Sequence, residues 1–134
     1  MEDFVTFEIA RKLKEKGFPQ NMCDDGYIIE EYDGYNIGDR SEIFVIPDCL
    51  PYIAAPTIAQ VLKWLREDKK ISVEKNVGMH PYKRDVCWYC TIVRFSESGV
   101  REILDNFGET CTVFDSYEEA VLSGIEYVLD NNLI

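Results

Sequence analysis

A chain of 134 residues has room for one domain, and we expect a single domain over residues 1–134. Its composition, with 46% hydrophobic and 29% charged residues, excludes a disordered, collagen-like or membrane-embedded chain. Twenty-five acidic residues against 14 basic ones give a net charge of −11, so we expect neither nucleic acid nor a membrane as a partner.

The first predicted element is a helix over residues 6–16. Apolar residues recur there at helical spacing, and Thr6 is a suitable N-cap. Gly17 suits the left-handed position after a helix, and Phe18 can fold back onto Leu13 as the apolar contact of a Schellman motif. The sequence therefore predicts both ends of this helix.

Between residues 21 and 56 the pattern changes to short apolar bursts. The bursts at 27–29 and 43–46 predict a hairpin or two edge-like strands, and Asp33-Gly34 has turn chemistry between them. The stretch that follows is interpreted as a connector, because three prolines make it unsuitable for a central strand: Pro47, Pro51 and Pro56.

Thr57 and Gln60 have the form of a capping box, and the apolar spacing after them predicts a helix over 57–68. Residues 70–74 alternate between apolar and polar, as a half-buried strand does. Residues 76–84 are interpreted as a loop, because they contain Gly78, His80 and Pro81.

Residues 85–95 are the strongest strand candidate, because they are β-branched or aromatic nearly throughout. The return strand is expected either at 100–104 or at 110–114, and the second stretch has the better composition. The pairing register stays open at this point.

A last helix is predicted over 117–131, with Ser116 as N-cap and Glu119 as its capping-box partner. Its apolar stripe includes Gly124, which lets the helix backbone approach a sheet closely. The order of helix, strands, helix, strands and helix favours an α+β fold. We expect an antiparallel sheet of about four or five strands packed against the three predicted helices.

Two features bear on compartment. The chain starts with Met1-Glu2-Asp3, which lacks the basic region of a signal peptide, and no apolar run reaches the roughly 18 residues of a membrane span. We therefore expect a cytoplasmic protein. The cysteines are odd in number and the core needs no disulfide, so we expect reduced thiols at Cys23, Cys49, Cys87, Cys90 and Cys111.

Cys87 and Cys90 match the C-x-x-C pattern, but the pair falls inside a predicted strand. A redox site needs its first cysteine at a helix N-terminus, and strand alternation points the two sulfurs to opposite faces. Structural zinc sites usually have two close pairs of ligands, whereas here one pair is accompanied only by His80 and Cys111. We interpret these cysteines as packing residues and expect no metal, cofactor or catalytic residue.

The segment from Asp24 to Asp48 is strongly acidic, because its carboxylates are opposed by one basic residue, Arg40. It lacks the ligand ladder of a calcium loop, whereas carboxylates paired as in a glycosidase stay open. Tyrosines interleave with the acids, and such a surface suits a basic protein partner, because acids steer encounter and tyrosines supply contact area. We expect the contacts at Asp24, Asp25, Tyr27, Glu30, Glu31, Tyr32 and Tyr35.

Three segments carry a resemblance to known proteins. They are Phe4-Val5-Thr6-Phe7-Glu8 leading into Leu13-Lys14-Glu15-Lys16-Gly17-Phe18, Ala55-Pro56-Thr57 with Gln60-Val61-Leu62-Lys63-Trp64-Leu65-Arg66-Glu67, and Ser116-Tyr117-Glu118-Glu119-Ala120 running to Asn132-Leu133-Ile134. In these segments the chain resembles a group of small proteins of gut Bacteroidales and of their phages and mobile elements, which have no known activity. The resemblance implies a cytoplasmic accessory protein, and it transfers no catalytic residue.

Antiparallel strands followed by the helix from Ser116 are also similar to HicB-type antitoxins. The element order from 57 to 131 is similar to a double-stranded-RNA-binding domain, but Glu118 and Glu119 stand where that domain needs lysines, which disfavours RNA. The favoured hypothesis is a non-enzymatic interaction module. The alternatives are a small enzyme that uses carboxylates or His80, and an antitoxin-like or self-associating structural protein.

Overall fold

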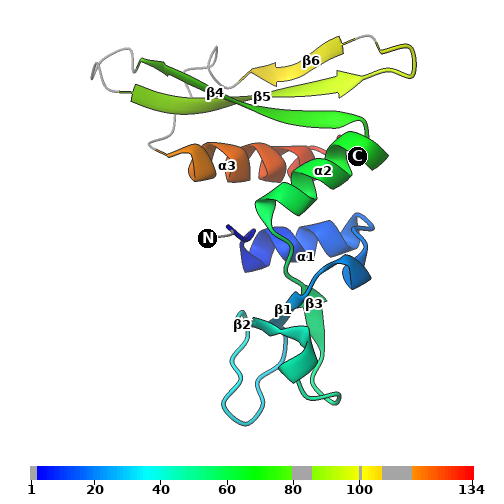
Figure 1. The fold of residues 1–134 in the computed structure, drawn as a ribbon, viewed down its shortest axis with the longest axis vertical. Coiled ribbons are helices and arrows are strands. Elements are labelled where there is room, and N and C mark those ends of the chain that lie inside the picture. The colour runs from blue at the N-terminus through cyan, green and yellow to red at the C-terminus, as the bar shows by residue number, and fades with distance from the viewer. Residues whose placement is uncertain (1–2, 80–85, 100, 107–115) are drawn as a thin grey trace. The chain divides into compact units, whose positions relative to one another are not determined.

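The computed structural model describes residues 3–79, 86–99, 101–106 and 116–134. The chain falls into two compact units, Met1–Val61 (unit 1) and Leu62–Ile134 (unit 2), and the boundary lies inside helix α2, Ile58–Asp68 (Figure 1). Each unit contains helix and an antiparallel sheet, which confirms the α+β class. The expectation of one domain over 1–134 stays a prediction, which a single unfolding transition seen by probes in both units would confirm.

The described strands form two three-stranded sheets, with orders β2-β1-β3 and β4-β5-β6, where the sequence led us to expect one sheet. The reason is the chain order. Along the chain, helix α2 separates β1–β3 from β4–β6. Strands that are joined by short connections pair with each other more often than with strands distant in the sequence.

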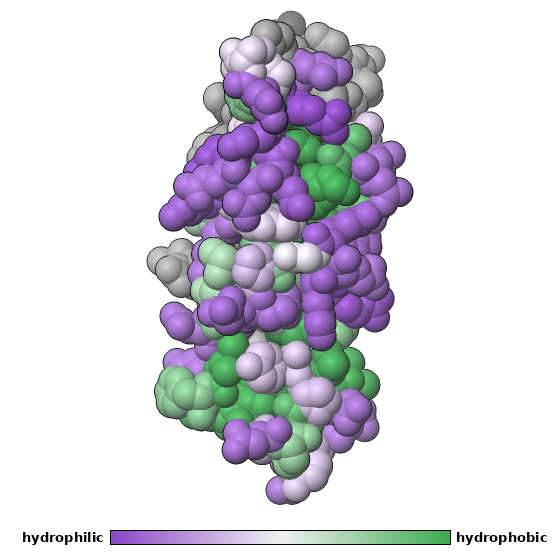
Figure 2. Space-filling view, turned by 90° about the vertical axis from the view of Figure 1, so that its right-hand side faces the viewer, coloured by the Kyte–Doolittle hydropathy of each residue, from purple (hydrophilic) through white to green (hydrophobic). Residues whose placement is uncertain are grey.

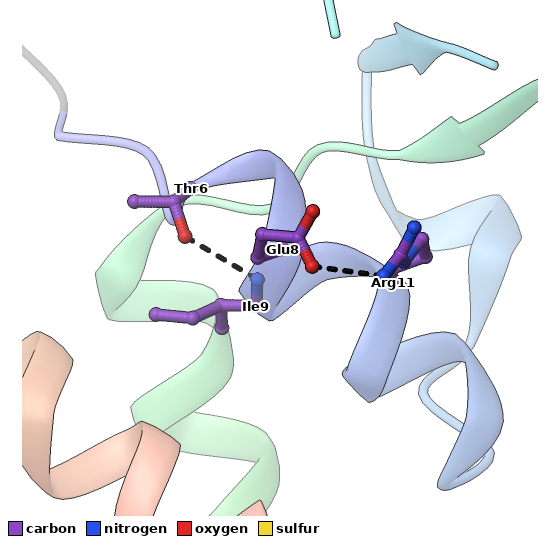
Figure 3. Close-up of polar contacts among 4 residues, drawn as sticks. All are labelled: Thr6, Glu8, Ile9 and Arg11. Atoms are coloured by element: carbon purple, nitrogen blue, oxygen red, sulfur yellow. Dashed lines mark hydrogen bonds and ion pairs between the residues drawn. The ribbon is translucent and has the colours of Figure 1, made fainter.

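Helix α1, Phe7–Glu15, begins and ends where the sequence predicts. The Thr6 hydroxyl accepts a hydrogen bond from the Ile9 N–H at 3.3 Å, and an exposed ion pair joins Arg11 to Glu8 at 2.9 Å (Figure 3). At the other end, the Phe18 N–H donates to the Leu13 carbonyl at 3.0 Å across a Gly17 with φ of 90°. This is the expected Schellman motif.

The sheet of unit 1 is built around β1, Asp25–Ile28, with β2, Arg40–Glu42, and β3, Tyr52–Ala54, on its two sides. Both pairs are antiparallel, and α1 contacts β3. Tyr27 is buried in this sheet, where its hydroxyl donates to the Val5 carbonyl. The strand β3 corrects our interpretation of its segment as a pure connector, because three residues between Pro51 and Pro56 are enough for a short edge strand.

The predicted strand at 43–46 is wrong. Ile43–Val45 form a turn of 3-10 helix, η2, and the Ile46 N–H donates to the Ile43 carbonyl at 3.1 Å. Four consecutive apolar residues lack the alternation of a half-buried strand, and Pro47 cannot extend a ladder. A second 3-10 turn, η1, covers Gln20–Met22. Ile46, which follows η2, belongs to the hydrophobic cluster of Ile28 and Leu50, and Ile43 packs against that cluster. The turn leaves Phe44 and Val45 in solvent.

The capping box of α2 is present as predicted. The Gln60 N–H donates to the Thr57 hydroxyl at 3.2 Å, and the Thr57 N–H donates to the Gln60 side-chain oxygen at 2.8 Å. The same Gln60 side chain donates from Nε2 to the Met22 carbonyl at 3.3 Å, so the start of α2 also fixes the chain that leads into β1.

Lys70 follows α2 with φ of 58°, a left-handed conformation that a side chain disfavours. Replacing it by glycine (Lys70→Gly) should raise the free energy of unfolding by about 0.5–1 kcal/mol, because glycine adopts this conformation without a Cβ clash. Chemical denaturation measures the effect. The neighbouring substitution Lys69→Gly, at a residue without positive φ, is the matched control and should lower stability; equal effects at both positions would contradict the argument.

The sheet of unit 2 consists of β4, Ile71–Met79, β5, Val86–Phe95, and β6, Arg101–Asn106. The predicted strand at 85–95 is confirmed, and it is the central strand, with a bulge between Ile92 and Val93. Strand β4 is longer than expected, so residues 76–79 are strand and not loop. The return strand is β6, close to the first of our two candidates. The other, 110–114, lies outside the described residues.

Helix α3, Tyr117–Asp130, packs against β4 and β5 (Figure 1). The Ser116 hydroxyl accepts from the Glu119 N–H at 3.2 Å, as predicted. Gly124 faces the sheet so closely that a Cβ there would lie 2.6 Å from Val73 Cγ1 and 2.9 Å from Cys90 Sγ. The glycine in the apolar stripe is therefore required by packing, as its position in the sequence predicts.

Candidate functional site

Unit 1 has an open hollow of about 830 Å³, which we call the groove. Four short stretches of chain meet at it: Phe4 ahead of α1, the entry into β1, the passage from β2 into η2, and the passage from β3 into α2. The residues that line the groove are Phe4, Cys23, Asp24, Asp25, Glu42, Ile43, Phe44, Ala55, Thr57, Ala59 and Gln60.

The backbone around the acidic residues of the groove is firmly held. The Ile43 N–H donates to the Asp24 carbonyl at 2.8 Å, and the Ala55 N–H donates to the Asp25 carbonyl at 2.9 Å. With Gln60 also bonded to the chain at Met22, both aspartates are fixed relative to η2 and α2. The groove is thus a preformed feature of unit 1.

Asp25 and Glu42 lie directly opposite each other across the β1–β2 pair. Like charges in that position destabilise a sheet. Asp25 is relieved by Arg40, whose Nε lies 3.5 Å from its Oδ2. Glu42 and the neighbouring Asp24 are exposed, and neither has an ion pair or side-chain hydrogen bond with any residue that the structure describes. The rim therefore offers negative charge that the described protein leaves unpaired.

The apolar part of the groove is unusual in its exposure. Phe44 is 82% exposed and its neighbour Val45 is 50% exposed on η2. Figure 2 shows hydrophobic surface gathered at the lower end of the view, where the sheet of unit 1 and η2 lie in Figure 1. An exposed phenylalanine beside a hollow of this size is typical of a recognition surface, because burial of its ring in a complex releases ordered water.

Phe4 forms one wall of the groove, and its aromatic ring already makes a cation–π contact within the protein. The guanidinium carbon of Arg40 lies 3.6 Å from the centre of that ring. The same guanidinium group contacts Asp25, so Arg40 bridges an aromatic and an acidic residue that both line the groove.

Cys23 also lines the groove, but it is only 8% exposed, and its Sγ lies 4.0 Å from Gln60 Oε1. Burial, and then the charges of Asp24 and Asp25, raise the pKa of its thiol from 9.0 to about 11. A thiol that holds its proton at neutral pH is a poor nucleophile. We therefore assign Cys23 a packing role.

Alkylation tests this assignment. At about pH 8, iodoacetamide should modify the exposed Cys49 while Cys23 stays unmodified, because almost no Cys23 thiolate is present. Between pH 9 and 11 the unfolded thiol loses its proton before the folded one, so the unfolded state binds fewer protons and the Cys23 contribution to stability falls as pH rises. Mass spectrometry of the peptides measures both sites, and fast labelling of Cys23 in folded protein would contradict the assignment.

The sequence-predicted contact residues separate in the structure. Asp24 and Asp25 line the groove, whereas Glu30, Glu31 and Tyr32 are exposed elsewhere in unit 1. Tyr35 packs on the hydrophobic cluster of Ile28, Ile46 and Leu50. Tyr27 is a correction, because its ring is buried and edge-on to Phe7, so it cannot contact a partner.

Sequence reasoning missed Phe4, Glu42 and Phe44 as groove residues. The one usable signal was the run Ile43-Phe44-Val45-Ile46 before Pro47, which is too apolar for a loop and does not alternate. Nothing in the sequence indicates that Phe4 lines the same groove as Glu42 and Phe44, because their meeting depends on the sheet register.

The cysteine pair lies where the sequence predicts, because Cys87 and Cys90 both belong to β5. Cys90 is buried below Gly124 and serves packing, whereas His80 and Cys111, the other zinc candidates, lie outside the described residues. Over the described ranges, no three His, Cys, Asp or Glu side chains gather closely enough to hold a metal ion.

None of the helices described, α1 to α3, is long and apolar enough to cross a membrane. Comparisons of the chain with protein families, curated proteins and solved structures find no match. The groove must therefore be interpreted from its own chemistry.

Proposed function

We propose that this protein is a non-enzymatic interaction module and that the groove of unit 1 binds a basic segment of a partner protein. The observation that carries the proposal is the combination in one hollow of two acids that no described residue pairs, Asp24 and Glu42, with the exposed ring of Phe44. Acids of this kind attract lysine or arginine, and a central aromatic ring supplies the contact energy.

The negative charge of the groove favours a cationic partner over a second copy of this chain. A second copy of this chain would bring another net charge of −11 to an acidic rim, and the two would repel. A cationic segment instead relieves the part of the repulsion between Asp25 and Glu42 that Arg40 leaves in place. The electrostatic repulsion between these carboxylates is therefore weaker in the complex than in the free protein, which favours binding.

The proposal includes a cytoplasmic setting and an origin in a phage or mobile element. Both are supported by the sequence resemblance. The genes next to this one test the origin, because a set of phage or transfer genes supports it and a conserved set of host metabolic genes contradicts it.

Selection from a library of random short peptides tests the binding function without knowledge of the natural partner. Immobilised protein should enrich peptides that combine lysine or arginine with bulky apolar residues, and their binding should weaken as salt rises. Enrichment of neutral or acidic peptides, or failure to enrich any sequence over several rounds, would contradict the proposal.

A further inference from the structure

We propose that Phe4 and Asp25 form an arginine subsite of the groove, which Arg40 occupies in the free protein and an arginine of the partner occupies in the complex. This inference rests on the proposed function and makes it more specific, because it names the side chain that the groove recognises. It also assigns Arg40 the role of an internal competitor.

The contacts of Arg40 show what the subsite accepts. Its guanidinium carbon lies 3.6 Å from the centre of the Phe4 ring, well within the roughly 6 Å range of a cation–π contact. Its Nε lies 3.5 Å from Asp25 Oδ2 at the same time. A planar guanidinium can stack on a ring and still direct N–H groups sideways to a carboxylate, whereas the compact ammonium of lysine makes one contact at the expense of the other. The subsite therefore favours arginine.

The position of Arg40 allows the exchange. It belongs to the edge strand β2, its backbone is held opposite Tyr27, and its side chain is 42% exposed. The side chain can thus rotate into solvent without breaking the β1–β2 ladder. Phe4 and Asp25 line the groove and Arg40 does not, so a partner guanidinium that enters the groove meets these two residues as Arg40 turns away.

The exchange also has a driving force. A partner arginine restores the two contacts that Arg40 gives up, so the exchange of one guanidinium for the other changes the free energy little. The rest of the partner segment then gains Asp24, Glu42 and the Phe44 ring, none of which the described protein pairs with a cation or covers. Only the partner makes this second set of contacts, and it therefore favours the complex.

The test removes the competitor and supplies a small probe. In Arg40→Ala, methylguanidinium should bind in the vacated subsite and shift the NMR signals of the Phe4 ring in a saturable way, with methylammonium about fivefold weaker or more. The wild-type protein should respond to neither probe at the same concentrations. Arg40→Thr, which suits the edge strand β2 and leaves the ring uncovered, serves as a second variant if Arg40→Ala does not fold, and Phe4→Leu should abolish the response in the Arg40→Ala background.

Peptide binding separates this inference from the proposed function. An arginine-containing peptide from the library should bind Arg40→Ala about three- to tenfold more tightly than wild type, because no internal guanidinium must leave. A folded Arg40 variant that binds methylguanidinium no better than wild type would overturn the subsite, even if the peptide still binds the groove. Loss of peptide binding in the wild type would overturn the proposed function, while the methylguanidinium response would still report on the subsite.

Discussion

Replacing Asp24 and Glu42 together by lysine should weaken binding of a library-selected basic peptide by about 30-fold at low salt. Each substitution converts an attraction into a repulsion, and both residues line the groove without a partner among the described residues. The loss should shrink as salt rises, since exposed charges are screened. Fluorescence anisotropy of the labelled peptide at several salt concentrations measures both effects. The free protein should keep its stability, because the change removes the repulsion between Glu42 and Asp25.

The matched control replaces Glu30 and Glu31 by lysine. These substitutions change the net charge by the same amount, but neither residue lines the groove. This double variant should bind the peptide within about threefold of wild type at physiological salt, because its charges act only through screened long-range attraction. Equal losses for the two double variants would show that the whole acidic segment attracts the peptide and that the groove confers no selectivity.

Gly124→Val in α3 should lower the free energy of unfolding by about 2–3 kcal/mol. A Cβ at this position would lie 2.6 Å from Val73 Cγ1. Val73 is β-branched, and its χ1 is too stiff to move that methyl group away easily. The helix would have to move off β4 and β5, with loss of packing around Val121, Ile125 and Val128. Urea or guanidinium denaturation measures the change.

Two comparisons make this result specific. Ser123→Val places the same β-branched residue one position earlier on α3 and should cost less than about 1 kcal/mol, mainly from helix propensity. In a double-mutant cycle, Val73→Ala should make Gly124→Ala less costly than it is in the wild-type background, because the colliding methyl group is gone. Additive effects would mean that the close contact between α3 and β4 does not limit the packing.

Much of the fold follows from local chemistry in the sequence. The caps at Thr6, Thr57 and Ser116, and the stop at Gly17 and Phe18, each depend on residues within five positions of one another. Such signals act within one turn of helix and can be recognised without knowledge of the rest of the chain. For the same reason, the bounds of all three described α-helices were predicted within one residue at each end.

The groove could be predicted only in part. Asp24 and Asp25 were found because they belong to a run of acids, but Phe4 and Glu42 reach the same hollow through the pairing of β1 with β2 and β3. Pairing register is a long-range property, and an isolated sequence does not fix it. Phe44 was assigned to a strand because its neighbours are apolar, whereas the turn η2 exposes it. Composition also could not show that Tyr27 is buried and Tyr32 is exposed, since both are tyrosines within the same acidic segment.

The claim that the groove of unit 1 binds a basic segment is tested most directly by NMR of the wild-type protein with a library-selected basic peptide. The account predicts saturable shifts at Phe4, Cys23, Phe44 and Ala59, with the signals of residues 116–134 unchanged. Shifts at residues 116–134 with the groove signals unmoved would place the binding site elsewhere and contradict it.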